Sequence, residues 1–180
     1  TYSSGLAATE RATTVSKQYD IPALIDQIAD ELRKKFDINE QTAMVGIHTG
    51  GVWIARQLHK ILQIQPPLGT LDISFYRDDF TRIGMNPQVK PSDLPFTLDE
   101  RNIILVDDVL HTGRTIRAAM NELFDYGRPA SIVLVTLVDR SGRELPIEAN
   151  IAGLHIKLGP GEHVKLSGPD PLTLETKSNA

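Results

Sequence analysis

The sequence predicts an α/β domain with a mainly parallel central sheet flanked by helices. Short runs of branched apolar residues, typical of strands buried on both faces, alternate with segments of helical periodicity. The order is strand, helix, strand, loop, strand, helix, strand, which favours a parallel sheet. Ligands of such sheets bind beyond the carboxyl ends of the strands, so the turns that follow the strands form the candidate site.

Three amphipathic segments predict helices because apolar residues recur in them at steps of three and four. They span residues 21–37, 52–62 and 115–126. Pro22 suits the first turn of the first helix, and Gly127 follows the last turn of the third.

Six short apolar runs predict strands, and they span residues 43–48, 71–76, 103–106, 131–138, 151–158 and 163–166. Between the second and third run, residues 77–98 hold three prolines and no sustained periodicity. A loop of this length in a compact domain is usually functional.

The length of 180 residues fits one domain with a sizeable core. Residues 1–20 are small and polar, which indicates a flexible arm or an expression remnant, and residues 171–180 are expected to form a loose tail. Residues 21–170 are expected to form the single domain.

The composition excludes several classes of function. With a net charge of −4, the surface as a whole does not favour non-specific nucleic-acid binding. The absence of cysteine excludes disulfides, cysteine–zinc sites and thiol nucleophiles. The chain shows neither a run long enough to span a membrane nor a signal pattern at its start, so we expect a cytoplasmic protein with no membrane partner.

The turn Thr112-Gly113-Arg114-Thr115 lies between a strand and a helix, where unpaired amides and the positive end of the helix dipole face outward. Two threonine hydroxyls add donors, so the turn is suited to hold one phosphate. The alternative is that Thr112 only caps the helix.

Asp107 and Asp108 stand side by side at the end of the strand before this turn. Adjacent carboxylates resist burial unless they face hydroxyls or a magnesium-bound ligand. Ribose offers two neighbouring hydroxyls that carboxylates can bind, so the two acids and the turn together predict a site for ribose 5-phosphate. The alternative is that the acids form a solvated corner of the surface. The chain has no P-loop, no G-x-G-x-x-G motif and no cluster of histidine ligands.

The segment IILVDDVLHTGRT resembles the phosphoribosyl-diphosphate signature of the type I phosphoribosyltransferases. SFYRDDF, LVDDVLHTGRTIRAAMNELFDYGRPASI and LVDRSGRELPI are similar to the pyrimidine-operon attenuators that also act as uracil phosphoribosyltransferases. The resemblance covers about residues 44–167. It implies the type I phosphoribosyltransferase fold with a flexible loop and a small hood, and a homodimer or tetramer.

The resemblance implies that uracil and 5-phosphoribosyl 1-diphosphate react to UMP and diphosphate with Mg²⁺. Asp107 and Asp108 would bind the ribose hydroxyls and, through the diphosphate, the metal. Arg77 would stand at the start of the flexible loop and stabilise the departing diphosphate. The remaining substrate contacts would be the diphosphate loop His48, Thr49, Gly50 and Gly51, the segment Val109, Leu110, Thr112, Gly113, Arg114 and Thr115, and Asp139 and Arg140 in a hood built by residues 138–146.

Three positions depart from the pattern of the family. Gly50 replaces the arginine of the diphosphate loop, which removes a positive charge. His111 stands where relatives more often carry an aromatic residue, and we hypothesise that it helps uracil lose its N1 proton. The alternative is that it fills space or contacts phosphate. The first helix lacks the R-I-x-H-E pattern of the RNA surface, although Arg140 and Arg143 remain as candidate contacts to a pyrimidine-operon leader RNA.

Three functions therefore stay open. The leading one is a uracil phosphoribosyltransferase that also regulates pyrimidine genes. The second is a UMP-responsive RNA-binding attenuation regulator with weak or no catalysis. The third is an enzyme of the same fold that acts on another base.

Overall fold

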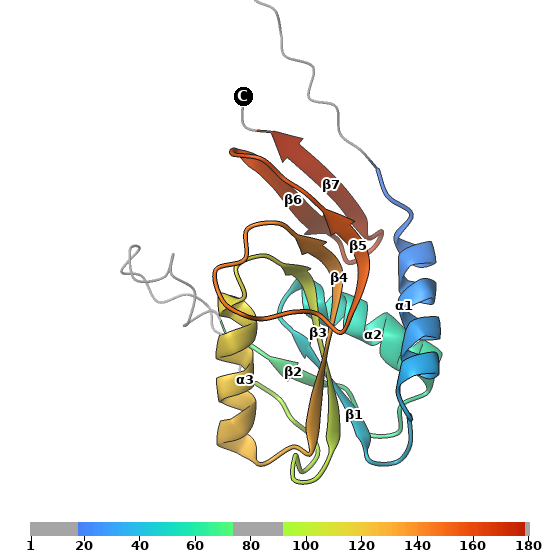
Figure 1. The fold of residues 1–180 in the computed structure, drawn as a ribbon. Helices are drawn as coiled ribbons and strands as arrows, with labels where there is room; N and C mark the ends of the chain where they lie inside the picture. Colours follow the sequence, from blue (N-terminus) through green and yellow to red (C-terminus); the bar gives the residue numbers. More distant parts are fainter. Residues whose placement is uncertain (1–17, 74–91, 179–180) are drawn as a thin grey trace, which may run out of the picture.

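In the computed structural model, residues 18–73 and 92–178 are described. The elements are α1 (Ile21–Lys35), β1 (Thr42–Ile47), α2 (Gly50–Leu62), β2 (Gly69–Leu71), β3 (Asn102–Leu110), α3 (Arg114–Tyr126), β4 (Ser131–Arg140), β5 (Ile151–Ile156), β6 (Glu162–Ser167) and β7 (Thr173–Ser178) (Figure 1).

The central sheet has five strands in the order β2-β1-β3-β4-β5, and every neighbouring pair is parallel. In the register, Ile104 of β3 lies between Met44 of β1 and Val133 of β4. The predicted fold class is confirmed. Because all strands run the same way, their carboxyl ends meet at one edge of the sheet.

Helices cover both faces of the sheet, with α1 and α2 on one face and α3 on the other (Figure 1). Successive side chains of a strand point to opposite faces. Ile104 and Val106 therefore pack in the core beneath α1 and α2, whereas Ile103 and Leu105 pack beneath α3. This double burial explains why the strands are continuous apolar runs in the sequence.

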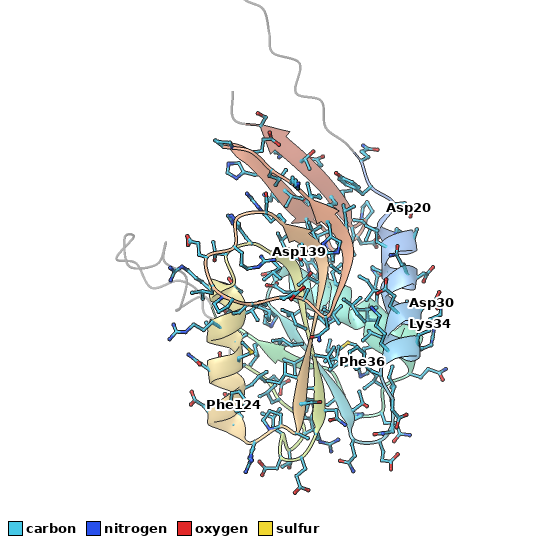
Figure 2. The ribbon with its side chains drawn as sticks, viewed as in Figure 1. Asp20, Asp30, Lys34, Phe36, Phe124 and Asp139 are labelled. Carbon is cyan, nitrogen blue, oxygen red and sulfur yellow. The ribbon has the colours of Figure 1, made fainter. Side chains whose placement is uncertain are left out.

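The ends of α1 are set by local chemistry. The Asp20 carboxylate accepts a hydrogen bond from the backbone N–H of Ala23 at 3.1 Å, and Pro22 follows the cap. The last turn carries Arg33, Lys34 and Lys35, which suit the negative end of the helix dipole. Figure 2 shows Asp20 and Lys34 at the two ends of this helix.

Two glycines let α2 begin very close to the sheet. A Cβ atom on Gly46 of β1 would lie 2.9 Å from the Ala55 Cβ atom, and one on Gly51 would lie 2.6 Å from the Val106 carbonyl oxygen. Real Cβ atoms do not approach other atoms so closely, so both positions need glycine. The N-terminus of α2 is thereby held against β3.

The chain ends in an antiparallel hairpin of β6 and β7, beyond the carboxyl edge of the central sheet (Figure 1). The loose tail predicted after Pro171 is therefore wrong, because residues 173–178 form β7. Leu166 and Leu174 are paired in register and 6% and 2% exposed, so both join the core. The strand was not predicted because β7 is polar apart from this one buried leucine.

Several predicted boundaries move. β3 continues through Leu110 instead of ending at Val106, α2 begins at Gly50, and α3 begins at Arg114. β2 is only Gly69–Leu71, whereas the prediction placed it at residues 71–76, of which 74–76 lie outside the described residues. Residues 1–17 of the expected arm and Arg77 also lie outside them. Within the described ranges, no helix is both long and apolar enough to cross a membrane.

Candidate active site

A cavity of about 540 Å³ opens at the carboxyl edge of the sheet, where sheets of this kind bind ligands. The residues that line it come from the ends of β1, β2 and β3, the start of α2 and α3, and β6. They are His48, Thr49, Gly50, Trp53, Asp72, Asp107, Asp108, Val109, His111, Thr115, Val164, Lys165 and Leu166.

The two adjacent acids of β3 are stabilised by the backbone that follows them. The Asp107 carboxylate accepts a hydrogen bond from the N–H of Asp108, and the Asp108 carboxylate accepts one from the N–H of Val109, both at 2.8 Å. Asp107 is only 5% exposed. Both acids line the cavity, so their remaining lone pairs are suited to hydroxyls of a ligand.

The loop before α2 lies directly against Asp108. A Cβ atom on Gly50 would fall 2.3 Å from Oδ2 of Asp108, so that carboxylate occupies the space into which a side chain at position 50 would grow. A side chain longer than that of glycine at position 50 would therefore meet the Asp108 carboxylate. The peptide bond between His48 and Thr49 is cis, and the His48 N–H donates to the Leu71 carbonyl oxygen at 2.8 Å.

The turn before α3 depends on one glycine in the left-handed region. Gly113 has φ of +95°, a conformation that favours glycine, and it precedes the first residue of the helix. The N-cap residue of α3 is Gly113 and no side chain caps the helix, so the alternative that Thr112 only caps it is wrong. The Thr112 hydroxyl accepts a hydrogen bond from the N–H of Arg114 at 3.2 Å. Thr115 lines the cavity, whereas Thr112, Gly113 and Arg114 are not among its lining residues.

A second turn is hydrogen-bonded to the turn before α3. We call residues 139–147 the hood turn, which leads out of β4. The backbone N–H groups of Glu144 and Leu145 both donate to the Thr112 carbonyl oxygen at 3.0 Å. The Arg114 guanidinium lies 3.3 Å from the Glu144 carboxylate. The two turns therefore form one hydrogen-bonded unit.

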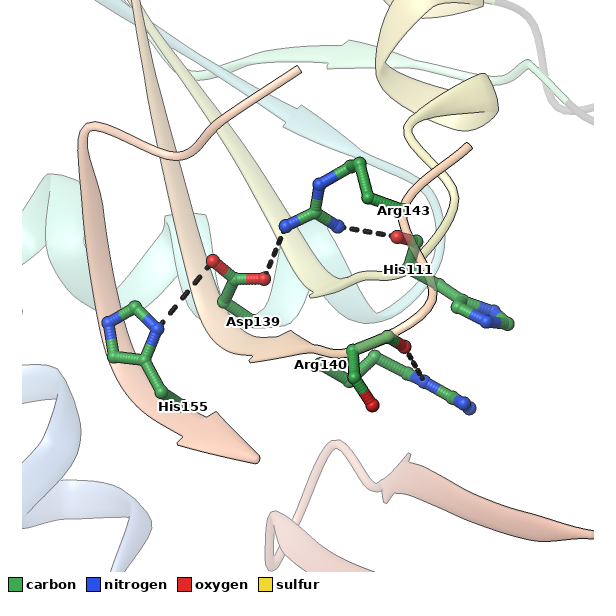
Figure 3. Close-up of polar contacts among 6 residues, drawn as sticks. His111, Asp139, Arg140, Arg143 and His155 are labelled. Carbon is green, nitrogen blue, oxygen red and sulfur yellow. Dashed lines mark hydrogen bonds and ion pairs between the residues drawn. The ribbon is translucent and has the colours of Figure 1, made fainter. Parts of the chain in front are cut away.

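Arg143 is the central side chain of this unit (Figure 3). Its guanidinium donates to the carbonyl oxygen of His111 and, at 2.6 Å, to the carboxylate of Asp139. Nδ1 of His155 lies 3.6 Å from the other oxygen of Asp139. Arg143, expected as an RNA contact, is thus bonded within the protein.

His111 lines the cavity with its ring beneath the hood turn, because a Cβ atom on Gly142 would lie 2.8 Å from its Nε2 atom. The residue keeps contact with solvent, yet partial burial of the imidazole lowers its pKa and the nearby Arg140 cation lowers it further. Glu144 acts in the opposite direction with a smaller effect. The neutral imidazole is therefore favoured at neutral pH.

Asp139 and Arg140, expected to contact substrate, do not line the central cavity. They line a neighbouring cavity of about 370 Å³ together with Ser141, Gly142, Arg143, His155, Ile156 and Lys157. Gly51 and Leu110 also lie outside the central cavity. Gly51 is buried between α2 and β3, and the Leu110 side chain is 1% exposed in the core beneath α3.

Five residues line the central cavity that sequence reasoning did not assign to it: Trp53, Asp72, Val164, Lys165 and Leu166. Trp53 closely follows the predicted diphosphate loop and Asp72 closely precedes Arg77, so their proximity in the sequence was a usable signal. The three residues of β6 are far away in the sequence and reach the cavity only because the β6–β7 hairpin folds over it.

The donor set fits a magnesium ion that arrives with a diphosphate. Asp72, Asp107 and Asp108 all bring carboxylates to the cavity, and Mg²⁺ prefers oxygen ligands shared between one or two carboxylates and substrate phosphates. Among residues 18–73 and 92–178, no group of three or more histidine or acidic side chains is arranged to hold a metal alone.

The fold and the acid-plus-turn site define a phosphoribosyltransferase. The family model for the phosphoribosyl transferase domain matches residues 14–160, so the chain belongs to this family. Among curated relatives, Bifunctional protein PyrR of Nitrosococcus oceani is 59% identical over 157 residues, which cover 85% of this chain and 89% of the relative. Bifunctional protein PyrR of Pseudomonas aeruginosa is 56% identical over 156 residues, with coverage of 86% and 92%.

Solved structures support the fold independently. A hypoxanthine phosphoribosyltransferase from Staphylococcus aureus matches with a TM-score of 0.62 at 23% identity, covering 85% of this chain and 81% of that chain. A purine phosphoribosyltransferase from Pyrococcus horikoshii matches with a TM-score of 0.58 at 23% identity, with coverage of 78% and 87%. At this identity the likeness concerns the fold alone.

Proposed function

We propose that this protein is a uracil phosphoribosyltransferase, which makes UMP and diphosphate from uracil and 5-phosphoribosyl 1-diphosphate. The observation that carries the proposal is the meeting of Asp107, Asp108, Thr115 and the start of α2 in one cavity. The motifs similar to the pyrimidine-operon attenuators that also act as uracil phosphoribosyltransferases support uracil as the base. Similar curated relatives carry the name Bifunctional protein PyrR.

In the proposed reaction, N1 of uracil forms a bond to C1 of the ribose while the bond from C1 to the diphosphate oxygen breaks. Positive charge develops on the ribose and negative charge on the leaving group, so preorganised charges and dipoles lower the barrier. We assign the ribose hydroxyls to Asp107 and Asp108. The turn Thr112–Thr115 receives the 5-phosphate, and His48, Thr49 and Gly50 receive the diphosphate.

The bound Mg²⁺ would supply positive charge to the diphosphate, with Asp107 and Asp108 as its nearby carboxylates. Arg77 remains the predicted cation of the flexible loop and lies outside the described residues. We place uracil beside Val109 and His111. The neutral imidazole favoured at His111 is the form that can accept the N1 proton.

The test is turnover with purified protein, 5-phosphoribosyl 1-diphosphate, Mg²⁺ and one base at a time: uracil, orotate, hypoxanthine or adenine. The proposal expects UMP formation with uracil and little product with the other three bases. Asp107→Asn should lower turnover by at least about a hundredfold, because the acids touch the reacting sugar. If product forms with only one of the other bases, that base and not uracil is the substrate. If no product forms with any base, the proposed enzymatic activity is wrong.

A second role as an RNA-binding regulator is favoured by one finding, the name "Bifunctional protein PyrR" of the relatives. Two features of this chain oppose it: α1 carries acids where the family pattern is basic, and the Arg143 guanidinium is bonded to Asp139 and His111. A gel shift with a pyrimidine-operon leader transcript, with and without UMP, separates the two roles.

The same samples, measured by light scattering, test the implied dimer or tetramer.

A further inference from the structure

Lys165 of the β6–β7 hairpin lines the cavity, and its side chain is exposed. Among the described residues that line the cavity, it is the only lysine or arginine, whereas three carboxylates face the same space from Asp72, Asp107 and Asp108. A sugar diphosphate that enters such a site meets like charges. It therefore needs a nearby cation, because desolvated anions are costly unless they are paired.

The loop before α2 does not supply that cation. Position 50 is a glycine, and the Asp108 carboxylate fills the space next to it, 2.3 Å from where a Cβ atom would lie. Backbone amides at the start of α2 favour an anion, yet they carry only partial charge. The charge that the family pattern places in this loop is missing here.

The Lys165 ammonium is available to a ligand. Within residues 18–73 and 92–178, it makes no ion pair or hydrogen bond. Its neighbour across the hairpin is Glu175, whose carboxylate lies 3.7 Å from the ammonium of Lys177 on the same strand. The acid that could have paired with Lys165 is thereby engaged by another lysine.

The hairpin holds Lys165 on a rigid element. The side chains on either side of it in β6 pack inward, with Val164 half-buried and Leu166 buried against the core below α1 and α2. The turn that joins the strands lies on α2, since a Cβ atom on Gly168 would fall 3.5 Å from the Trp53 ring. A cation on a fixed strand loses less entropy on binding than one on a loose tail.

We propose that Lys165 binds the diphosphate of the substrate and so replaces the charge that the loop before α2 lacks. The assignment rests on the proposed function, because it takes 5-phosphoribosyl 1-diphosphate as the ligand. It predicts that the β6–β7 hairpin belongs to the substrate site and not only to the outer surface of the molecule.

The experiment compares the wild type with Lys165→Gln, Lys165→Arg and Lys177→Gln by isothermal titration calorimetry. The ligands are 5-phosphoribosyl 1-diphosphate, inorganic diphosphate and ribose 5-phosphate, each with Mg²⁺. Lys177→Gln is the matched control, since it removes the same charge from the same hairpin outside the cavity. Thermal unfolding of each variant checks that the fold is kept.

The proposal expects Lys165→Gln to weaken binding of both diphosphate ligands by about tenfold or more, in keeping with a charge-assisted contact. Binding of ribose 5-phosphate should change less than twofold, and Lys165→Arg should restore most of the affinity. In turnover, the KM for 5-phosphoribosyl 1-diphosphate should rise while the KM for uracil stays near the wild-type value.

An effect of Lys165→Gln below twofold on both diphosphate ligands would overturn the proposal. An equal loss for ribose 5-phosphate would overturn the assignment to the diphosphate, as would an equal loss in Lys177→Gln. The calorimetry does not depend on turnover. If the wild type binds the sugar diphosphate but makes no UMP, the uracil activity fails and the binding comparison still decides the role of Lys165.

Discussion

Arg143 donates a hydrogen bond to the backbone carbonyl oxygen of His111, and so joins the hood turn to the turn before α3 (Figure 3). The same guanidinium binds Asp139 at 2.6 Å. The backbone at His111 and the side chains of Asp139 and Arg143 are thereby joined in one arrangement.

Replacing Arg143 with methionine should therefore affect both stability and catalysis. The variant loses two charge-assisted hydrogen bonds and leaves the half-buried Asp139 carboxylate without its arginine, so we expect the free energy of unfolding to fall by about 1–3 kcal/mol. Misplacement of His111 should lower kcat/KM by about tenfold or more. Urea unfolding and steady-state kinetics measure the two effects.

The control for Arg143→Met is Arg117→Gln, which removes a charge from the exposed face of α3. It should leave both measurements near the wild-type values. If Arg143→Met unfolds and turns over like this control, the bridge does not organise the site.

Gly50→Ala tests the close approach of α2 to Asp108. The new Cβ atom would lie 2.3 Å from Oδ2 of Asp108, so the carboxylate must move away from its present position. We expect kcat/KM to fall by about tenfold, with a smaller change in stability, because alanine favours the helix by up to about 1 kcal/mol over glycine. Steady-state kinetics and thermal unfolding provide the comparison.

Gly159→Ala is the matched control for Gly50→Ala. Its Cβ atom would meet only the flexible end of the Glu162 side chain, at 3.2 Å. Unchanged kinetics in Gly50→Ala would mean that the reaction does not need Asp108 where the structure places it.

The pH dependence of the reaction tests His111. Its pKa lies below the ordinary value of 6.5, chiefly through partial burial and then through Arg140. The folded protein therefore holds this proton less tightly than the unfolded chain does. His111 lowers stability as the pH falls from about 6.5 toward the folded pKa, and has no such effect above 6.5.

If neutral His111 accepts the N1 proton of uracil, turnover should stay high down to pH 6.5 and fall below it, as the imidazole becomes charged. His111→Phe should lower kcat by about tenfold to a hundredfold at neutral pH and remove that acidic limb. The measurement is kcat/KM for uracil from pH 5 to 9. Near-normal turnover of His111→Phe between pH 6 and 9 would rule out the acid–base role.

Leu174→Ala tests whether β7 belongs to the folded domain. The side chain is 2% exposed and packs in the core below α1 and α2, so its truncation should cost about 2–4 kcal/mol in the free energy of unfolding. Thr173→Ala, at an exposed neighbour, should cost less than about 0.5 kcal/mol. Equal urea midpoints for the two variants would show that the strand adds nothing to stability.

The sequence was sufficient for the sheet and the helices because their signals are local. Branched apolar runs and helical periodicity predict elements one at a time, and parallel topology then brings Asp107, Asp108 and Thr115 to one edge. The structure places these three in one cavity, while their roles toward a substrate stay predictions.

The hairpin could not be predicted in the same way. Lys165 reaches the cavity through the packing of β6 on α2 and the central sheet, contacts between residues far apart in the sequence. Likewise, only the folded structure shows that Asp139 and Arg140 line a neighbouring cavity and that Arg143 is bonded within the protein. Long-range packing decides such positions, and no local pattern reports it.

The carbonyl oxygen of Thr112 accepts hydrogen bonds from both Glu144 and Leu145. This shared acceptor has a consequence for chimaeras between phosphoribosyltransferases. A donor sequence grafted over residues 139–147 alone would meet a foreign partner at Thr112 and at His111, and would shift the turn that precedes α3. Exchanging residues 111–115 together with 139–147 keeps both partners native to each other, so we expect the two turns to tolerate exchange only as a pair.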